Sequence, residues 1–379
     1  MRIAISLISS VDYGGVTYAR NLILALAEND KLNKYYIYAA NPELFQEIPQ
    51  QDNFFFKKCK INHKSLLVRF LWEQFILPYH LSRIKADLLF TAKNITVFFA
   101  PCKAVIAIQN MEPFFFTRYD NDWKLNIRSY LKKFFSEMSL RRAEGVISVS
   151  AFSRRSIEKV YPGVKDKITV IYNGNPLQGV SISDDSEPGQ KPYFLSSSKF
   201  VAYANQLNLV NGYVLLNRKV KDLPPLWLVG GKFDNKYFNK INNFVKENGL
   251  EQKIIILGFL PYERLIKLYR KSSLFLFPST LEACPQTLIE AMSCGASIVA
   301  SCSEPMPEIC VDAAVYFDPY SPEDICDKIE EVYLNTGLRE KLSKLALERS
   351  RFFDWNRIAV ETIDFFHRIA VDKKTQGVA

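Results

Sequence analysis

The stretch "LFLFPSTLEACPQTLIEAMSCGASIVAS" (Leu274–Ser301) decides the fold prediction for this chain. Its first four residues form a continuous apolar run, which is typical of a parallel strand covered on both faces. Pro285 suits the first position of a helix, where a missing N–H has no cost, and Gly295 suits the left-handed residue after a helix end. The apolar run that follows completes a strand–helix–strand unit.

Two glutamates stand on either side of this turn. Glu282 lies in the loop after the strand, and Glu290 lies about a turn and a half into the helix. Open α/β sheets bind ligands at the carboxyl ends of their strands, and a helix N-terminus there favours anions. Carboxylates accept hydrogen bonds from sugar hydroxyls, so the pair fits a ligand with a central phosphate and hydroxyl-rich rings at both ends. The alternative interpretation is two solvated glutamates, one of them favoured by the helix dipole.

Length and composition indicate a globular protein of two domains. The chain has 379 residues, of which 48% are hydrophobic and 23% charged. Its seven cysteines form no C-x-x-C pair, and we interpret them as free thiols in a reducing cytosol. The apolar stretch at residues 95–108 is interrupted by Pro101 and Lys103, so we expect no membrane-spanning helix. The start "MRIAISLI" is too short for a signal peptide. We therefore expect a cytoplasmic protein.

The charge is unevenly distributed along the chain. Residues 1–180 contain 25 Lys and Arg against 15 Asp and Glu, whereas residues 181–379 contain 24 against 25. A basic half predicts an anionic partner, which leaves nucleic acid, acidic lipid and a phosphorylated acceptor open. No recognition motif for nucleic acid accompanies the charge, so we expect no nucleic acid partner.

The chain divides at "SISDDSEPGQKP" (Ser181–Pro192), which is polar and contains Pro and Gly. On both sides, short apolar runs alternate with amphipathic segments. This predicts an α/β protein with two Rossmann-like, doubly wound domains, residues 1–182 and 193–355, that face a central cleft. Residues 356–379 are predicted to form a helix that packs back on the first domain. The expected strands lie at residues 2–8, 103–108, 145–150, 167–173, 225–231, 253–259, 273–279 and 296–301.

Several collinear segments resemble one protein family. They are the opening stretch, "LGFLPYERLIKLYRKSS" (257–273), "YGGVTYARNL" (13–22), "IQNMEPF" (108–114), "SVSAFSRRSI" (148–157) and "VIYNGNP" (170–176). Over nearly the whole chain they are similar to glycosyltransferase family 4, whose members are retaining enzymes of the GT-B fold. The E-x7-E motif of this family falls on Glu282 and Glu290.

The resemblance implies a nucleotide sugar donor in the second domain and a glycan or lipid-linked acceptor in the first. Glu290 would hold the ribose hydroxyls, Glu282 the hydroxyls of the transferred sugar, and the N–H groups at Thr287 and Leu288 would face the diphosphate. The other implied positions are Gly258 and Phe259 beside the base, Gly15 on the donor side, and Gly14, Gln109 and Asn110 on the acceptor side. Hexosyl transfer of this kind is expected to need no cofactor and no metal, because the leaving phosphate steers the incoming hydroxyl.

Two departures from the family pattern bear on activity. Many members carry a His where this chain has Gln109. The family pattern G-R-x4–5-K-G supplies two cations to the diphosphate, whereas here Lys199 aligns near the first and Ala204 on the second. Losing one cation removes stabilisation of the leaving group unless another, such as Lys232, replaces it.

Three hypotheses for function follow. The first is a retaining glycosyltransferase of polysaccharide or glycolipid assembly, with Glu282 and Lys199 as its catalytic residues. The second is a degenerate, non-catalytic binding or assembly subunit, which Ala204 favours. The third is a nucleotide-sugar epimerase. This hypothesis is weaker, because the carboxylates and histidines that such enzymes use in the cleft are not evident in this sequence.

A helix predicted over residues 123–145 carries an apolar stripe with basic residues beside it. The stripe contains Trp123, Ile127, Tyr130, Leu131, Phe134 and Met138. It either faces the core or docks on an anionic bilayer, in which case the protein would be peripheral on the inner face of the membrane.

Overall fold

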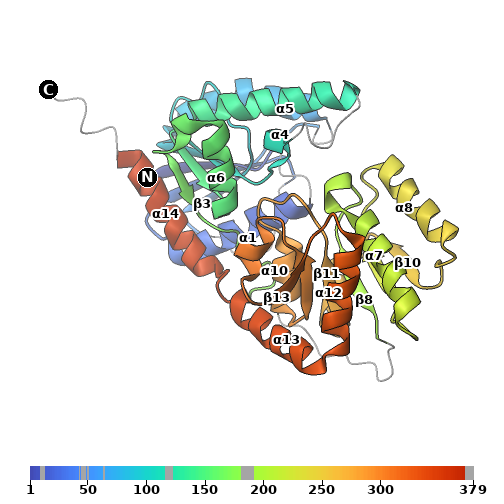
Figure 1. Cartoon of the computed structure of the whole chain (residues 1–379). Helices are drawn as coiled ribbons and strands as arrows, with labels where there is room; N and C mark the ends of the chain where they lie inside the picture. The colour runs from blue at the N-terminus through green and yellow to red at the C-terminus, as the bar shows by residue number, and fades with distance from the viewer. Residues whose placement is uncertain are drawn as a thin grey trace. The chain divides into compact units, whose positions relative to one another are not determined.

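The computed structural model describes residues 1–8, 13–41, 43, 48, 51–62, 65–115, 123–180 and 192–371, and at 13–14 and 123–129 it describes the backbone alone. The chain forms two compact α/β units (Figure 1). Unit 1 consists of residues 1–176 and 354–379, and unit 2 of residues 177–353. Of the predicted linker, residues 181–191 lie outside the description.

Unit 1 is built on a seven-stranded sheet in the order β3-β2-β1-β4-β5-β6-β7, with every neighbouring pair parallel. The chain order reverses between β1 and β4, which is the switch point where doubly wound folds bind ligands. The strands are β1 (Arg2–Ser6), β2 (Lys34–Ala39), β3 (Phe54–Lys58), β4 (Leu88–Thr91), β5 (Lys103–Ile108), β6 (Gly145–Ser148) and β7 (Ile168–Val170).

Alternate residues of these buried strands face two different helical layers. Ile3 and Phe90 join the core beneath α1 and α14, whereas Ala4 and Leu89 join the core beneath the segment α2–η2–α3. The helices are α1 (Tyr13–Asn29), α2 (Leu66–Leu71), the π-helical η2 (Trp72–Ile76), α3 (Leu77–Ile84), α4 (Glu112–Phe115), α5 (Trp123–Arg142), α6 (Ala151–Val160), the 3₁₀ turn η4 (Pro162–Val164) and α14 (Trp355–Val371).

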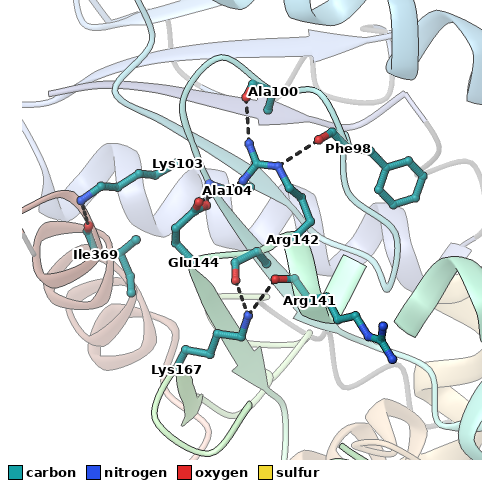
Figure 2. A network of polar contacts seen from close by, with 10 residues as sticks. Phe98, Ala100, Lys103, Ala104, Arg141, Arg142, Glu144, Lys167 and Ile369 are labelled. Atoms are coloured by element: carbon teal, nitrogen blue, oxygen red, sulfur yellow. Dashed lines mark hydrogen bonds and ion pairs between the residues drawn. The ribbon is translucent and has the colours of Figure 1, made fainter. Parts of the chain in front are cut away.

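Hydrogen bonds anchor α14, the last helix of the chain, to unit 1. The Nζ of Lys103 donates to the carbonyl of Ile369 at 2.6 Å (Figure 2). It also donates to the carbonyl of Ala370 at 3.0 Å, and these two bonds cap the end of α14. At the other end, the indole N–H of Trp355 donates to the carbonyl of Asn175 at 2.9 Å. The C-terminal helix is therefore part of the first unit, although its sequence follows that of the second.

A polar network joins the end of α5 to the sheet. Arg142 donates to the carbonyls of Phe98 and Ala100, both at 2.9 Å, and pairs with Glu144 at 2.9 Å (Figure 2). Glu144 in turn accepts from the N–H of Ala104 at the start of β5. These bonds satisfy carbonyl and amide groups of the connection before β5, which would otherwise lose hydrogen bonds on burial.

Three residues of the apolar stripe of α5 do not face the core. Tyr130, Leu131 and Phe134 are exposed, whereas Ser136 and Ser139 are buried. Ser139 accepts from the N–H of Thr96 and donates to the carbonyl of Phe135, so small polar residues let this helix approach the chain before β5. The core-facing interpretation of the stripe is therefore wrong for these three side chains. The side chains of Trp123 and Ile127 lie outside the description.

Unit 2 is built on a six-stranded parallel sheet in the order β10-β9-β8-β11-β12-β13, with its switch point between β8 and β11. The strands are β8 (Phe194–Ser197), β9 (Leu226–Val229), β10 (Ile254–Gly258), β11 (Leu274–Phe277), β12 (Ile298–Ser301) and β13 (Ala314–Phe317). The helices are the 3₁₀ turn η5 (Ala202–Ala204), α7 (Gln206–Lys219), α8 (Asn235–Glu247), α9 (Tyr262–Lys271), α10 (Gln286–Ser293), α11 (Met306–Cys310), α12 (Pro322–Leu334) and α13 (Thr336–Ser350).

Local signals in the sequence predicted the turn after β11 closely, and the turn after β1 less well. Pro285 is the N-cap residue of α10 rather than its first helical residue, and Gly295 has the expected positive φ of 69°. In contrast, α1 begins at Tyr13, so Gly14 and Gly15 lie in its first turn and not in a loop. No helix in the described part of the chain is long and apolar enough to cross a membrane.

The contact between Gly174 and Trp355 provides a test of how α14 is held. A Cβ at Gly174 would lie 2.3 Å from the Trp355 ring, whereas a Cβ at Gly163 of the same unit would have open space around it. We expect Gly174→Ala to lower the free energy of unfolding by about 1–3 kcal/mol, the usual cost of overpacking. Gly163→Ala is the control and should be neutral in thermal melts. Equal melting temperatures for the two variants would contradict this account.

Candidate active site

The switch point of unit 2 gathers polar side chains at the carboxyl ends of β8 and β11. Ser198 and Lys199 follow β8, and the segment Pro278–Pro285 connects β11 to α10. All four residues of β8 and all four residues of β11 are buried. Polar groups that could meet a ligand in this region therefore lie beyond the strand ends. The N-cap residue of α10 is Pro285, whose side chain cannot accept a hydrogen bond. No side chain therefore caps the N-terminal amides of α10.

Glu282 and Lys199 come together at this edge. The Oγ of Ser279 donates to Oε1 of Glu282 at 2.8 Å. Burial raises the pKa of Glu282, while the Ser279 hydrogen bond and the charge of Lys199 partly offset that rise. The Nζ of Lys199 lies 5.2 Å from the Tyr203 ring centroid and 4.9 Å from that of Phe233. Two aromatic faces thus hold an ammonium group near a carboxylate.

Glu290 is buried in the first turns of α10. It accepts hydrogen bonds from the hydroxyl of Tyr262 at Oε1 (2.9 Å) and from that of Tyr269 at Oε2 (3.1 Å). Burial raises the pKa of Glu290 to about 7, although both hydrogen bonds act in the opposite direction. Burial and the nearby carboxylate also raise the pKa of Tyr269 well above its ordinary value. Each carboxylate oxygen still has a second lone pair with which to accept a hydroxyl.

The two tyrosines were not identified from the sequence. They are seven residues apart on the amphipathic helix α9, a spacing that returns to the same helical face after two turns. That spacing could have suggested a shared partner. Only the packing of α9 against α10 shows that the partner is Glu290.

Three further predicted positions lie at the carboxyl ends of β9 and β10. Gly258 has φ of 70°, and Phe259 after it is exposed. The Nζ of Lys232 lies 4.1 Å from the Phe238 ring centroid, and the backbone of Lys232 bridges to that of Phe200. Nearby, a Cβ at Gly230 would come within 1.9 Å of the Ser198 carbonyl, so the backbones after β8 and β9 meet closely only because this residue is Gly.

At the start of α10 the two predicted positions differ. Thr287 is half-buried, and Leu288 is fully buried with its N–H donated to the Pro285 carbonyl at 3.1 Å. The Leu288 amide is therefore engaged within the turn and does not point freely at a ligand. The prediction that it would face a phosphate is not supported at this amide.

Ala204, aligned with the second cation of the family pattern, is fully buried in η5. Asn205 after it adopts the left-handed conformation, with φ of 57°, and its Nδ2 donates to the carbonyls of Pro278 and Pro319. The turn before α7 is therefore held by an Asn side chain. The backbone of Pro278 ties this turn to the loop that carries Glu282.

The predicted acceptor-side residues of unit 1 form an amide cluster after β5. The side chains of Gln109 and Asn173 exchange two hydrogen bonds, of 3.2 and 3.0 Å. The Oδ1 of Asn94 accepts from the N–H groups of Gln109 and Asn110. The Gln109 that stands where many family members carry His is thus paired with Asn173. Gly14 and Gly15 lie at the start of α1 and are not part of this cluster.

The two described histidines make contacts away from the predicted donor-side and acceptor-side residues. The ring of His80 stacks on Trp72 with 5.7 Å between centroids, and His367 lies 3.2 Å from the Nδ2 of Asn33. His63 lies outside the described residues. Among the residues that the structure describes, no group of three His, Cys, Asp or Glu side chains is arranged to hold a metal.

Each half of the chain matches a family model of glycosyltransferases. Residues 13–178 match the model described as Glycosyltransferase Family 4, and residues 181–349 match the model described as Glycosyl transferases group 1. An O-antigen chain mannosyltransferase B of Escherichia coli is 26% identical over 247 residues, which are 62% of this chain and 64% of that protein. The chain thus spans just under two thirds of this relative.

Solved structures share the fold at low sequence identity. A sucrose-phosphate synthase from Thermosynechococcus elongatus has a TM-score of 0.74 at 16% identity, covering 97% of this chain and 99% of that one. HepE of Anabaena, in complex with UDP and glucose, has a TM-score of 0.70 at 18% identity, covering 97% and 100%. The predicted fold class, two doubly wound parallel α/β units, is confirmed.

The raised pKa of Glu290 predicts how the pH dependence of stability changes with this side chain. The folded pKa of about 7 lies above the ordinary 4.5, so the folded state retains a proton that the unfolded state loses. As pH rises from about 5 to 8, wild-type stability should therefore fall relative to Glu290→Gln, by up to on the order of 3 kcal/mol.

Chemical denaturation at several pH values measures this difference. Glu263→Gln, which changes an exposed carboxylate on α9, is the control and should follow the wild type at every pH. A constant difference between wild type and Glu290→Gln from pH 5 to 8 would disprove the elevated pKa.

Proposed function

Because this chain belongs to glycosyltransferase family 4, we propose that it moves a hexose from a nucleotide diphosphate sugar to a glycan or lipid-linked acceptor, with retention of anomeric configuration. The chain is a glycosyltransferase by family, and its donor, acceptor and stereochemistry belong to the proposal. The observation that carries the proposal is the approach of Lys199 to Glu282 at the switch point of unit 2. Its relatives include a mannosyltransferase of O-antigen synthesis, which supports a role in polysaccharide or glycolipid assembly.

Glu290 would bind the ribose of the donor. Tyr262 and Tyr269 already occupy one lone pair on each carboxylate oxygen and fix its orientation. The two free lone pairs can accept the two ribose hydroxyls. Binding favours the ionised carboxylate, because its oxygens accept hydrogen bonds more strongly than those of the neutral acid. Phe259, exposed beside Gly258, would contact the base.

Glu282 and Lys199 would act on the reacting groups. The carboxylate of Glu282 would accept hydroxyls of the transferred sugar, while the ammonium of Lys199 would stabilise the charge that develops on the leaving diphosphate. The N-terminus of α10, with the Thr287 amide, adds its dipole at the same edge. The acceptor oxygen bonds to the anomeric carbon as the bond to the diphosphate breaks, and a phosphate oxygen takes the acceptor's proton. No protein base and no metal are needed for this step.

A non-catalytic donor-binding subunit is the second candidate, and Ala204 is the observation that favours it. Its position is fully buried, so the second cation of the family pattern is replaced by a methyl group. Lys232 is the candidate to supply that charge if the protein is active. Its side chain is exposed, with its ammonium over Phe238, and could turn toward a diphosphate.

Turnover of nucleotide sugars distinguishes the two candidates. We expect the protein to transfer or hydrolyse at least one donor from a panel of UDP- and GDP-linked hexoses offered with lipid-linked acceptors. Lys199→Ala should lower kcat by about two orders of magnitude, the usual cost of losing one preorganised donor. Lys344→Ala, which removes an exposed lysine of α13, is the control and should retain full activity.

Normal turnover in Lys199→Ala would disprove the site assignment while leaving the enzyme in place. Donor binding without transfer or hydrolysis across the whole panel would support the binding subunit instead.

An exposed apolar surface in unit 1 fits a lipid-linked acceptor. Leu67 of α2 and Phe75 of η2 are 64% and 65% exposed, and Leu66, Leu71, Tyr130, Leu131 and Phe134 are exposed as well. Phe70 of α2 contacts Phe135 of α5, with 5.1 Å between ring centroids, so these two helices are neighbours. The half of the chain that carries them is the basic one. We propose that this apolar surface docks on an anionic bilayer at the inner face of the cytoplasmic membrane.

Liposome flotation tests this surface. Acidic vesicles should recover the protein, neutral vesicles should recover little, and recovery should fall as salt rises. Replacing both Leu67 and Phe75 by Ser should reduce recovery several-fold, because apolar insertion is lost. Leu334→Ser, which changes an equally exposed leucine of unit 2, is the control. Equal recovery with acidic and neutral vesicles at every salt concentration would rule out docking through charge.

A further inference from the structure

A charged cluster lies at the switch point of unit 1, at the carboxyl ends of β1 and β4. Glu73 is buried in η2 and accepts from the Oγ of Ser6, the last residue of β1, at 2.8 Å. It also pairs with the Nζ of Lys93, which follows β4, at 2.5 Å. Glu73 thus connects the two strands between which the chain order reverses. Its segment is π-helical, a conformation that is often found at functional sites.

Arg69 lies four residues before Glu73 and faces the same cluster. Only 8% of its surface is exposed. Desolvation is the main cause that lowers the pKa of Lys93, and the nearby charge of Arg69 lowers it further. The Nε of Arg69 has no hydrogen-bond partner. Across the described ranges of the chain, no ion pair or side-chain hydrogen bond is found for its guanidinium. An enclosed Arg is normally paired, because desolvating an unpaired charge is costly.

Thr91 is a second unsatisfied group at this place. It is the last residue of β4, it pairs in register with Ser6, and it is fully buried with no partner for its Oγ1. By strand alternation, Ser6 and Thr91 lie on the same face as Ala4 and Leu89, which is the face covered by α2–η2–α3. A guanidinium and a hydroxyl that lack partners therefore lie around one edge of the sheet.

Among the residues of this cluster that the structure describes, the positive charges exceed the negative. Arg69 and Lys93 carry two positive charges, and Glu73 carries one negative charge. A surplus cation inside an enclosed switch point is an arrangement that an anion would complete. A phosphate suits it best, because the fork of Arg donates two parallel hydrogen bonds to phosphate oxygens and the Thr hydroxyl can add a third.

We propose that Arg69, with Lys93 and Thr91, binds a phosphate group of the acceptor. The proposal rests on the proposed function, in which unit 1 receives the acceptor, and it specifies that acceptor as a phosphorylated one. The phosphate belongs either to a lipid carrier or to a phosphorylated sugar. Both present the same tetrahedral anion, and the probes below separate them.

Calorimetric titration of the full-length protein with inorganic phosphate, glucose 1-phosphate and dioctanoyl phosphatidic acid tests the site. Arg69→Gln should weaken binding of the preferred probe at least about tenfold, since a hydrogen bond to a charged group is lost. Arg69→Lys should retain part of the affinity, because it keeps the charge without the fork. Arg83→Gln, an exposed arginine on α3, is the matched control and should bind like the wild type.

Thermal stability in phosphate-free buffer separates a binding role from a structural one. If Arg69 serves to bind a ligand and does not support the fold, Arg69→Gln should melt at the same temperature as the wild type or higher. The reason is that the substitution removes an unpaired buried charge. A lower melting temperature would show that Arg69 supports the fold and would overturn the proposal. Equal phosphate affinity in wild type and Arg69→Gln would overturn it as well.

The outcome is independent of the donor site. Lys199→Ala changes unit 2 and should leave the Arg69-dependent part of phosphate binding intact. If instead Lys199→Ala abolishes all phosphate binding and Arg69→Gln none of it, the phosphate site belongs to unit 2 and the proposal fails. Unchanged transfer to a phosphorylated acceptor in Arg69→Gln would also refute the proposal while leaving the glycosyltransferase in place.

Discussion

Burial of both faces of a parallel sheet is the constraint on which the rest of the structure depends. The side chains of each strand pack alternately against the two helical layers, as Ile3 and Ala4 illustrate. Polar groups that serve a ligand can then stand only at the last strand residues or beyond them. Because parallel strands all end at one edge, those groups collect there, and the reversal of chain order opens the place where they meet. Lys199 and Glu282 in unit 2, and Ser6 and Glu73 in unit 1, occupy equivalent places.

Desolvation gives these edges their chemical character. Burial raises the pKa of Glu290 to about 7 and lowers that of Lys93. In each case a specific partner opposes the effect, which is the two tyrosine hydroxyls for Glu290 and Glu73 for Lys93. Groups held between burial and a partner respond strongly to an added ligand, which is why perturbed residues gather at functional sites.

The segment α2–η2 combines two opposite surfaces. Its inner face carries Arg69 and Glu73 to the end of the sheet, and its outer face exposes Leu67 and Phe75. A soluble helix normally turns such leucines inward. The inversion makes sense for an acceptor whose lipid part stays in a bilayer while its phosphate reaches the protein. One short segment would then serve both the membrane and the acceptor.

The sequence by itself determined the fold class, the family, the strands at β1, β5–β7 and β9–β12, and the turn from β11 into α10, because apolar runs, Pro and Gly act through local backbone geometry. It also predicted that Lys199 and both glutamates lie at one edge. Only the tertiary structure revealed that Tyr262 and Tyr269 hold Glu290, and that Tyr130, Leu131 and Phe134 of α5 are exposed. These features depend on which residues distant in sequence share one space. Periodicity reports that a helix has an apolar face, but the surface against which that face packs, or fails to pack, is decided by the rest of the chain.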